Sequence, residues 1–299
     1  MPGSRHVLVA LLITALGLAG CSPAVPAASV TPEVTAVAAL EVDGRPVVLH
    51  VPETLDPAVP SALVVVLHGY TGSASGTIDY FGLRALADER GFLVAAPQGT
   101  TDPEGKTFWN ASAACCNFHG SQVDDSGHLD RVITAVGEAH PVEEGRVYVV
   151  GHSNGAFMAH RFACDHADRV AAIASLAGAL DVDAHCAPSR PVSVLQVHGE
   201  ADDSILFDGG EIDGDRYTSA RDTVAVWRRL DGCGAAGHPQ GPWDADGAVP
   251  GDDLTSLSWT GCRAGTDVAL WTIEDGGHVP ALTAGFTAAL YDWLEARAR

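Results

Sequence analysis

Residues 147–159 read VYVVGHSNGAFMA, an apolar run followed by a G-x-S-x-G motif and a second apolar stretch. The branched residues before Gly151 predict a buried strand, and the residues after Gly155 predict a helix. A chain that passes from strand to helix this quickly turns sharply, and the two glycines let neighbouring backbone approach closely. Such a turn presents the Ser153 oxygen above the sheet, so we expect Ser153 to act as a nucleophile.

Apolar runs and segments of helical spacing alternate along the rest of the chain. A hairpin is expected around Asp43-Gly44-Arg45, before the main sheet begins. The expected strands are 63–67, 92–96, 147–150, 170–175, 192–197 and 268–273, and the expected helices are 78–90, 127–139, 154–166, 219–230 and 280–297. Continuous apolar runs are typical of parallel strands covered on both faces. The pattern predicts an α/β fold with a doubly wound, mostly parallel sheet and helices on both faces.

Two polar segments follow strands of this predicted sheet. The first contains Asp202, after strand 192–197, and the second contains His278, after strand 268–273. Because ligands of such sheets bind at the carboxyl ends of the strands, Ser153, Asp202 and His278 are expected to converge there. Their order along the chain is the nucleophile, acid, base order of α/β-hydrolases. Asp203 is the alternative acid.

A tetrahedral intermediate formed on Ser153 would need hydrogen-bond donors for its oxyanion. The backbone N–H of Asn154, directly after the nucleophile, is the first expected donor. The segment HGYTG at 68–72 follows strand 63–67 and supplies the second, with Tyr70 preferred and Thr71 as the alternative. Three further histidines near these motifs are expected to buttress strand ends: His68, His152 and His198.

The first residues of the chain have the composition of an export signal. Arg5 precedes an apolar stretch over 7–18, and small residues stand immediately before Cys21. Leu18-Ala19-Gly20-Cys21 resembles a bacterial lipobox, which implies lipidation of Cys21 and a membrane anchor. We therefore expect a lipoprotein signal peptide at 1–20, a flexible tether at 21–37 and a catalytic domain at 38–299. Secretion without an anchor is the alternative.

Six further cysteines indicate disulfides in an oxidising compartment. Cys233 follows a predicted helix and Cys262 follows a predicted strand, so this pair is expected first. Cys115 and Cys116 are not expected to pair with each other, because a bridge between neighbours closes a strained ring; pairing with Cys164 and Cys186 is the alternative. The spacing contains no zinc motif, so no metal is predicted. The net charge of −21 argues against nucleic-acid binding.

Seven motifs together resemble the polyhydroxybutyrate depolymerase and feruloyl esterase group of the α/β-hydrolase superfamily. They are HGY at 68–70, WN at 109–110, CC at 115–116, VDD at 123–125, RVYVVGHSNG at 146–155, HGEAD at 198–202 and GGH at 276–278. The resemblance implies a carboxylic ester hydrolase that needs no cofactor. It matches Ser153, Asp202 and His278 to the family's triad, and Tyr70 and Asn154 to its oxyanion positions.

Three departures from the family pattern bear on the substrate. Tyr70 stands where cysteine is common, Asp203 where proline is common, and Val279-Pro280 where Thr-Trp-Pro is common. The first two leave backbone chemistry unchanged, whereas the third alters the wall beside the base. Trp109 is expected to line the acyl or alcohol pocket, with a core tryptophan as the alternative.

The expected function is hydrolysis of hydroxyalkanoate, feruloyl or acetyl esters outside the cytoplasm, through an acyl-enzyme on Ser153. A small-molecule or polymeric ester is the expected partner, and the membrane is contacted through Cys21. A serine peptidase is the nearest chemical alternative, because the same triad cleaves amides. A non-catalytic, envelope-binding lipoprotein is the alternative from a different class. The sequence leaves the acyl and alcohol groups and the oligomeric state open.

Overall fold

The computed structural model describes residues 39–182 and 185–299. The predicted signal peptide at 1–20, the predicted tether at 21–37 and Cys21 itself lie outside these described residues. Within them, no helix is both long enough and apolar enough to cross a membrane.

A ten-stranded sheet runs through the described residues, in the order β1-β2-β4-β3-β7-β8-β9-β14-β13-β12. The strands are β1 (Ala39–Val42), β2 (Arg45–His50), β3 (Ser61–Leu67), β4 (Leu93–Pro97), β7 (Val142–His152), β8 (Ala172–Leu176), β9 (Ser193–Gly199), β12 (His238–Trp243), β13 (Leu254–Trp259) and β14 (Val268–Ile273). The central strands from β4 to β14 pair in parallel, and the strands at both edges pair antiparallel. Strands β3, β4, β8 and β9 are buried along their whole length, as continuous apolar runs predict.

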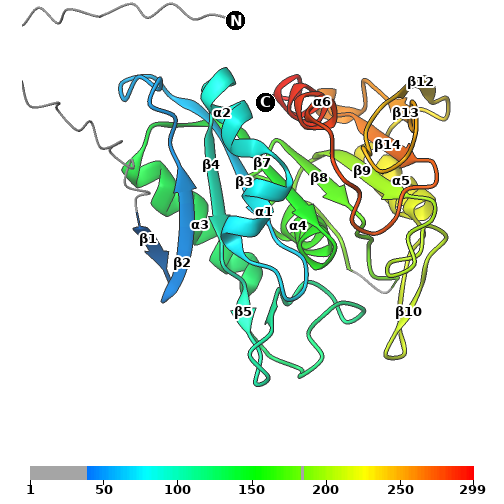
Figure 1. Ribbon diagram of the computed structural model, residues 1–299, viewed down its shortest axis with the longest axis horizontal. Coiled ribbons are helices and arrows are strands. Elements are labelled where there is room, and N and C mark those ends of the chain that lie inside the picture. The colour runs from blue at the N-terminus through cyan, green and yellow to red at the C-terminus, as the bar shows by residue number, and fades with distance from the viewer. Residues whose placement is uncertain (1–38, 183–184) are drawn as a thin grey trace, which may run out of the picture. The chain divides into compact units, whose positions relative to one another are not determined.

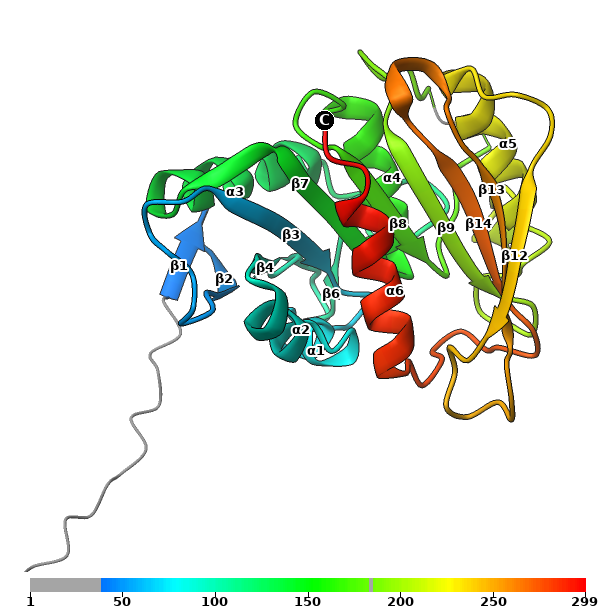
Figure 2. The same ribbon diagram turned by 90° about the horizontal axis from the view of Figure 1, so that it is seen from above.

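Helices cover both faces of the sheet (Figure 1, Figure 2). They are α1 (Ala74–Tyr80), α2 (Leu83–Arg90), α3 (Asp125–Ala139), α4 (Asn154–Asp165), α5 (Ala220–Asp231) and α6 (Ala284–Glu295), with one 3-10 turn at Arg263–Gly265. Residues of α3, α4 and α5 share one apolar core with one face of the sheet, and residues of α1, α2 and α6 share a second core with the other face. The predicted doubly wound α/β-hydrolase fold is therefore confirmed.

Two short hairpins lie outside the main sheet. Strands β5 (Thr100–Thr101) and β6 (Thr107–Phe108) pair in the long loop after β4, and β10 (Gly210–Ile212) pairs with β11 (Asp215–Tyr217) before α5.

Two predicted helices differ from the structure, and two strands of the main sheet were not predicted. The single helix expected at 78–90 is two helices, because Gly82 adopts a left-handed conformation (φ 63°) between them. The helix expected from Pro280 begins only at Ala284, since the Thr283 side chain accepts the Phe286 N–H and caps the helix there. Strands β12 and β13 extend the sheet and were not predicted. The residues of β12 are almost all exposed and carry no alternating apolar pattern, and β13 has only three apolar residues at irregular spacing.

Three disulfides join the six cysteines of the described residues. Cys233 pairs with Cys262, the pair expected first. The expectation that Cys115 and Cys116 do not pair with each other is wrong: they form a disulfide, and the cis peptide bond between them places their Cα atoms 3.1 Å apart. Cys164 is consequently joined to Cys186.

Candidate active site

Ser153 stands at a sharp turn between β7 and α4. Its backbone has φ 54° and ψ −123°, a conformation that L-residues rarely adopt. A Cβ on Gly151 would collide with the carbonyl of Gly155, and a Cβ on Gly155 would collide with the carbonyls of Leu67 and His68. The two glycines of the motif are therefore required by packing, and the turn presents Ser153 at the carboxyl end of the sheet.

His278 lies between Ser153 and Asp202. Its Nε2 is 2.9 Å from Ser153 Oγ, and its Nδ1 is 3.0 and 2.9 Å from the two carboxylate oxygens of Asp202. The three side chains come from loops after β7, β9 and β14, which are far apart in sequence. The structure thus brings together the three residues that the sequence predicts, with the geometry of a nucleophile, a base and an orienting acid.

The carboxylate of Asp202 is buried, and both of its oxygens have polar partners. Its Oδ1 accepts the backbone N–H groups of Ser204 and Ile205, each at 2.9 Å, and His198 Nε2 lies 3.3 Å from its Oδ2. Burial by itself raises the pKa of Asp202, but hydrogen bonds from His198, His278 and the Ser204 N–H outweigh burial and hold the pKa well below its usual range. Asp202 is therefore an anion throughout the neutral range. Asp203, the alternative acid, is exposed and hydrogen-bonds Ser204 Oγ instead.

His152 supports the loop that carries the base. Its Nε2 donates to the carbonyl oxygen of His278 at 2.8 Å, and its ring lies 5.1 Å from the His278 ring. Burial lowers the pKa of His152 to about 4, so this ring is neutral and the Nε2 proton is fixed by the carbonyl. His152 therefore has the supporting position that the sequence predicts, at the end of β7 and against the loop of His278.

The segment 68–72 forms a tight turn beside the nucleophile. The Gly72 N–H donates to the Gly69 carbonyl at 2.9 Å, and a Cβ on Gly69 would lie 3.2 Å from the Ser153 Cβ. The Thr71 N–H donates to the Thr107 carbonyl at 2.7 Å and is thereby occupied. The described residues offer no hydrogen-bond acceptor to the N–H of Tyr70 or of Asn154. Tyr70 and Asn154 are thus the available donors, and Thr71 is not.

The expectation that Trp109 lines a substrate pocket is wrong. Its side chain is fully buried, and its Nε1–H donates to the His68 carbonyl at 2.9 Å. Its backbone N–H donates to Asn154 Oδ1 at 2.6 Å, while Asn154 Nδ2 donates to its carbonyl at 3.0 Å. Trp109 therefore ties the loop after β4 to the nucleophile turn and to the oxyanion segment, and contacts no open surface.

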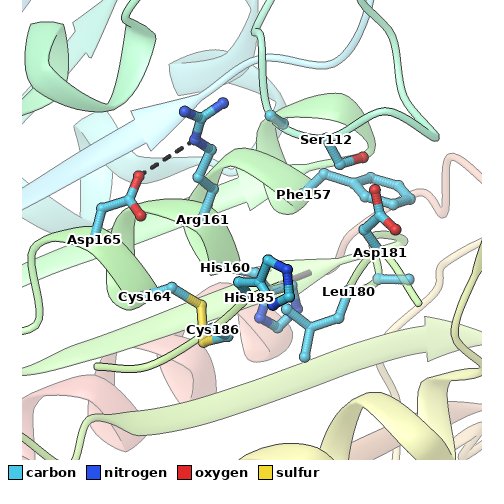
Figure 3. A pocket seen from close by; sticks show the side chains of 12 residues that line it. Ser112, Phe157, His160, Arg161, Cys164, Asp165, Leu180, Asp181, His185 and Cys186 are labelled. Carbon is cyan, nitrogen blue, oxygen red and sulfur yellow. Dashed lines mark hydrogen bonds and ion pairs between the residues drawn. A yellow bond between two sulfur atoms is a disulfide. The ribbon is translucent and has the colours of Figure 1, made fainter. Parts of the chain in front are cut away.

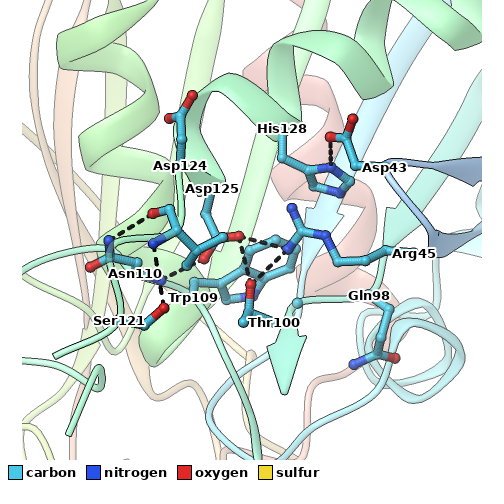
Figure 4. Close-up of polar contacts among 12 residues, drawn as sticks. Asp43, Arg45, Gln98, Thr100, Trp109, Asn110, Ser121, Asp124, Asp125 and His128 are labelled. Atoms are coloured by element: carbon cyan, nitrogen blue, oxygen red, sulfur yellow. Dashed lines mark hydrogen bonds and ion pairs between the residues drawn. The ribbon is translucent and has the colours of Figure 1, made fainter. Parts of the chain in front are cut away.

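A second buried carboxylate, Asp125, was not identified as a site residue from the sequence. Its Oδ1 is 2.6 Å from Arg45 Nη1 and accepts the Thr100 hydroxyl, and its Oδ2 accepts the Asn110 N–H at 2.7 Å (Figure 4). The contacts fasten the loop that carries Trp109 to the start of α3. The WN and VDD motifs were the signal for this contact, since Asn110 and Asp125 belong to them.

Three exposed apolar side chains lie on, or pack against, segments that carry site residues. Val279, next to the base, is 64% exposed, and Leu206, on the loop of Asp202, is 45% exposed. Phe118 is 44% exposed and packs edge-on against Tyr70, with the ring centroids 5.3 Å apart. We call Phe118, Leu206 and Val279 the apolar rim.

A cavity of about 190 Å³ lies along α4 beside the Cys164–Cys186 disulfide (Figure 3). Phe157, His160 and Leu180 belong to its wall. None of the three catalytic residues lines it.

One group of three possible metal ligands occurs among the described residues: Asp102, Glu104 and His119. Asp102 Oδ1 accepts the N–H groups of Glu104 and Lys106, and His119 Nε2 lies 2.5 Å from Glu104 Oε2. These contacts account for the group as a folded loop.

Known proteins share both sequence and fold with this chain. The profile of the family described as alpha/beta hydrolase fold matches residues 62–209. NocK of Nocardia uniformis subsp. tsuyamanensis, named as an esterase, is 29% identical over 90% of this chain and 87% of its own length. Feruloyl esterase B of Piromyces equi is 28% identical over 78% of this chain, which spans only 42% of that protein.

Solved structures share the fold at lower identity. The acetyl xylan esterase of Aspergillus awamori superimposes with a TM-score of 0.60 at 18% identity, over 84% of this chain and 94% of that one. The Bacillus cereus carboxylesterase gives a TM-score of 0.55 at 14% identity, over 85% of this chain and 94% of that one. The sheet order, the family profile and these structures show that the chain has the α/β-hydrolase fold, and its sequence is similar to that of proteins named as esterases.

Proposed function

We propose that the protein is an extracytoplasmic serine esterase that cleaves carboxylic esters through an acyl-enzyme on Ser153. The observation that carries the proposal is the hydrogen-bonded series Ser153 Oγ, His278 Nε2, His278 Nδ1, Asp202 carboxylate, with each step at 2.9 to 3.0 Å. The positive φ of Ser153 and the two available backbone N–H groups support the same chemistry.

The reaction begins when Ser153 Oγ attacks the ester carbonyl and its proton moves to His278 Nε2. The carbonyl π electrons move to oxygen, and the N–H groups of Tyr70 and Asn154 receive the oxyanion. Asp202 holds the Nδ1–H form of His278 and stabilises the imidazolium. The carbonyl re-forms as the C–O bond to the alcohol breaks, and His278 donates its Nε2 proton to the departing oxygen. Water then repeats the sequence on the acyl-enzyme and releases the acid and free Ser153.

The apolar rim favours a substrate with apolar groups on either side of the ester bond. Phe118, Leu206 and Val279 expose hydrocarbon surface on three different loops around the triad. Hydroxyalkanoate and feruloyl esters present such groups, and acetyl esters of sugars present fewer. Several relatives are named as feruloyl esterases and one structural neighbour as an acetyl xylan esterase, and these names support including the same ester classes in a substrate comparison.

The location follows from the cysteines. Three disulfides are typical of proteins that fold in an oxidising compartment. We propose that Cys21 carries a lipid that holds the protein at the membrane. Membrane fractionation of the wild-type protein and of Cys21→Ala tests the anchor: the variant is expected in the soluble fraction, and a variant that stays with the membrane would contradict it.

The function is tested with a panel of p-nitrophenyl, hydroxybutyrate-oligomer and feruloyl esters compared by kcat/KM. Ser153→Ala is expected to lower turnover of every accepted ester by about 10⁴ or more while the protein stays folded. Ser189→Ala, at an exposed bend away from the triad, is the matched control and is expected to retain wild-type turnover. Retained turnover in Ser153→Ala would overturn the assignment.

A further inference from the structure

Asp202 has a second imidazole partner that the triad does not include. His198 lies on β9 four residues before Asp202, its side chain is fully buried, and its Nε2 is 3.3 Å from Asp202 Oδ2 and 2.7 Å from the Ile205 carbonyl oxygen. The tautomer of His198 decides the nature of this contact, because only the form with its proton on Nε2 can donate to the carboxylate.

The polar contacts behind His198 continue across the core. Gln196 stands two residues earlier on β9, so its side chain points to the same face of the sheet as His198. Gln196 Nε2 is 3.2 Å from His198 Nδ1 and 2.7 Å from the Gly178 carbonyl oxygen. Gln196 Oε1 is 3.0 Å from His160 Nε2 on α4, and Trp227 Nε1 on α5 is 3.0 Å from His160 Nδ1.

The tryptophan at the far end fixes the direction of every hydrogen bond in this series. An indole N–H can only donate, so His160 Nδ1 accepts from Trp227 and the His160 proton is on Nε2. Burial lowers the pKa of His160 to about 4, so the ring stays neutral. His160 therefore donates to Gln196 Oε1.

The fixed direction of the hydrogen bonds continues from Gln196 to the active site. With its oxygen facing His160, its amide NH₂ donates to the Gly178 carbonyl and to His198 Nδ1. His198 Nδ1 is thereby an acceptor, and the His198 proton is on Nε2, facing Asp202 and Ile205. One proton arrangement satisfies all four side chains, and each of them is almost completely buried.

We propose that Trp227, His160, Gln196 and His198 form a positioning relay that keeps His198 in its Nε2–H form, so that Asp202 receives a hydrogen bond from each of two imidazoles. The proposal rests on the proposed esterase function for its kinetic consequence but not for its structure. A hydrogen bond from His198 makes the Asp202 carboxylate a weaker acceptor for His278. The relay therefore reduces how strongly Asp202 stabilises the protonated, imidazolium form of His278. The relay residues touch no substrate; they set the basicity of the group that does.

Other ionisable groups near the catalytic carboxylate do not obscure this effect. His152 and Tyr217 interact with it electrostatically; burial lowers the pKa of His152 to about 4 and raises that of Tyr217 above its usual value. Neither therefore changes charge between about pH 6 and 9. Glu200 and Asp203, the acidic residues on the same loop, are exposed to solvent.

The decisive variant is His198→Asn, because an asparagine amide replaces the Nδ1 side of the ring and removes the Nε2 donor. Without this donor, Asp202 stabilises the imidazolium form of His278 more strongly. The acidic limb of the pH profile of kcat/KM is therefore expected to shift to higher pH, by about 0.5 to 1 pH unit. His198→Gln keeps a donor near the Nε2 position and is expected to return the limb to its wild-type place. His238→Asn, at an exposed position of β12, is the matched control and leaves the limb unmoved.

Gln196→Glu tests the sign. A carboxylate facing His198 Nδ1 draws a second proton onto that ring, and the resulting cation beside Asp202 is expected to move the acidic limb to lower pH. A purely structural role for these residues would lower kcat in both variants without opposite shifts. An unmoved limb in folded His198→Asn, or a shift in the same direction in both variants, would overturn the relay.

A measurement without substrate separates the relay from the esterase assignment. The ¹⁵N chemical shifts of His198 in the wild-type protein are expected to report a protonated Nε2 and an unprotonated Nδ1 at pH 7. An Nδ1–H tautomer would overturn the relay whether or not the protein hydrolyses esters and whether or not the variants fold. A protein with the expected tautomer that hydrolyses no ester would contradict the proposed function alone.

Discussion

Two buried aspartates, Asp202 and Asp125, stabilise different loops near the nucleophile by different contacts. Asp202 is hydrogen-bonded to His278 and two backbone N–H groups, and His198 Nε2 lies 3.3 Å from its Oδ2, on a loop at the end of the sheet. Asp125 is paired with Arg45 at 2.6 Å and fastens the loop that carries Trp109. One carboxylate faces rings that can change protonation, and the other faces a cation that is always charged.

The difference separates catalysis from stability within one site. A carboxylate paired with a guanidinium keeps its partner at every working pH, which suits a structural anchor. A carboxylate shared between imidazoles stabilises a positive charge only when one appears, which suits the base of a hydrolytic reaction. Substitutions at the two aspartates should therefore affect different measurements.

Asp202→Asn is expected to have the largest effect, a fall in kcat of about 10⁴. An asparagine amide favours the His278 form with its proton on Nε2, and that form cannot accept the Ser153 proton. The kcat for a p-nitrophenyl ester, together with a urea unfolding curve, measures both consequences. A fall below about tenfold would show that Asp202 does not orient the base.

Asp125→Asn is expected to act chiefly on stability, lowering the free energy of unfolding by about 3 kcal/mol, because Arg45 keeps its charge in a partly buried place without a carboxylate. Urea unfolding at pH 7 measures it. Asp208→Asn is the control, since the Asp208–Arg221 pair is exposed and is expected to contribute less than about 1 kcal/mol. Equal effects at the two positions would remove the distinction drawn for Asp125.

The role of Asp202 in the triad could be predicted from the sequence, whereas the structural role of Asp125 could not. Ser153, Asp202 and His278 each follow a predicted strand, and parallel strands carry such residues to one edge whatever the loop geometry. Asp125 lies at the start of a helix, and its partners Arg45 and Thr100 are 80 and 25 residues away. No period or spacing links those positions, so only the folded chain reveals the contact.

A third buried aspartate, Asp231, differs from both because it forms no ion pair among the described residues. Its Oδ1 accepts the Val192 N–H at 3.4 Å, and burial raises its pKa to about 7. The folded protein thus binds this proton more tightly than the unfolded chain, whose carboxyl titrates near pH 4. The free energy of unfolding therefore falls as the pH rises from about 4 to about 7.

Asp231→Asn is expected to remove this part of the pH dependence. At pH 8 the variant should be more stable than the wild-type protein by about 2 kcal/mol, and the difference should disappear toward pH 4. Urea unfolding at several pH values measures it, with Asp213→Asn in an exposed turn as the control. A difference that does not depend on pH would show that Asp231 is ionised in the folded protein.

The smallest expected effect belongs to Trp109→Phe, which keeps the ring and removes the hydrogen bond to the His68 carbonyl. Stability should fall by about 1 kcal/mol, and the ranking of esters by kcat/KM should not change. A changed ranking would restore Trp109 to the substrate pocket. The buried position of Trp109 could not be predicted from its motif, because a tryptophan near an active site has the same sequence pattern whether it lines a pocket or supports a loop.

The disulfides also mark the limit of prediction from sequence. The pair Cys233 and Cys262 was the one expected first, whereas the pairing of Cys115 with Cys116 depends on a local backbone geometry that no pattern indicates. Strand β12 was missed for a related reason, since an exposed edge strand needs few apolar residues.

The central claim, that Ser153 is an activated nucleophile, is tested most directly by reaction with a fluorophosphonate probe followed by peptide mass spectrometry. The wild-type protein is expected to carry one phosphonyl group on the peptide that contains Ser153, and Asp202→Asn is expected to react far more slowly. Absence of labelling in the folded wild-type protein, or labelling on a different serine, would contradict the account.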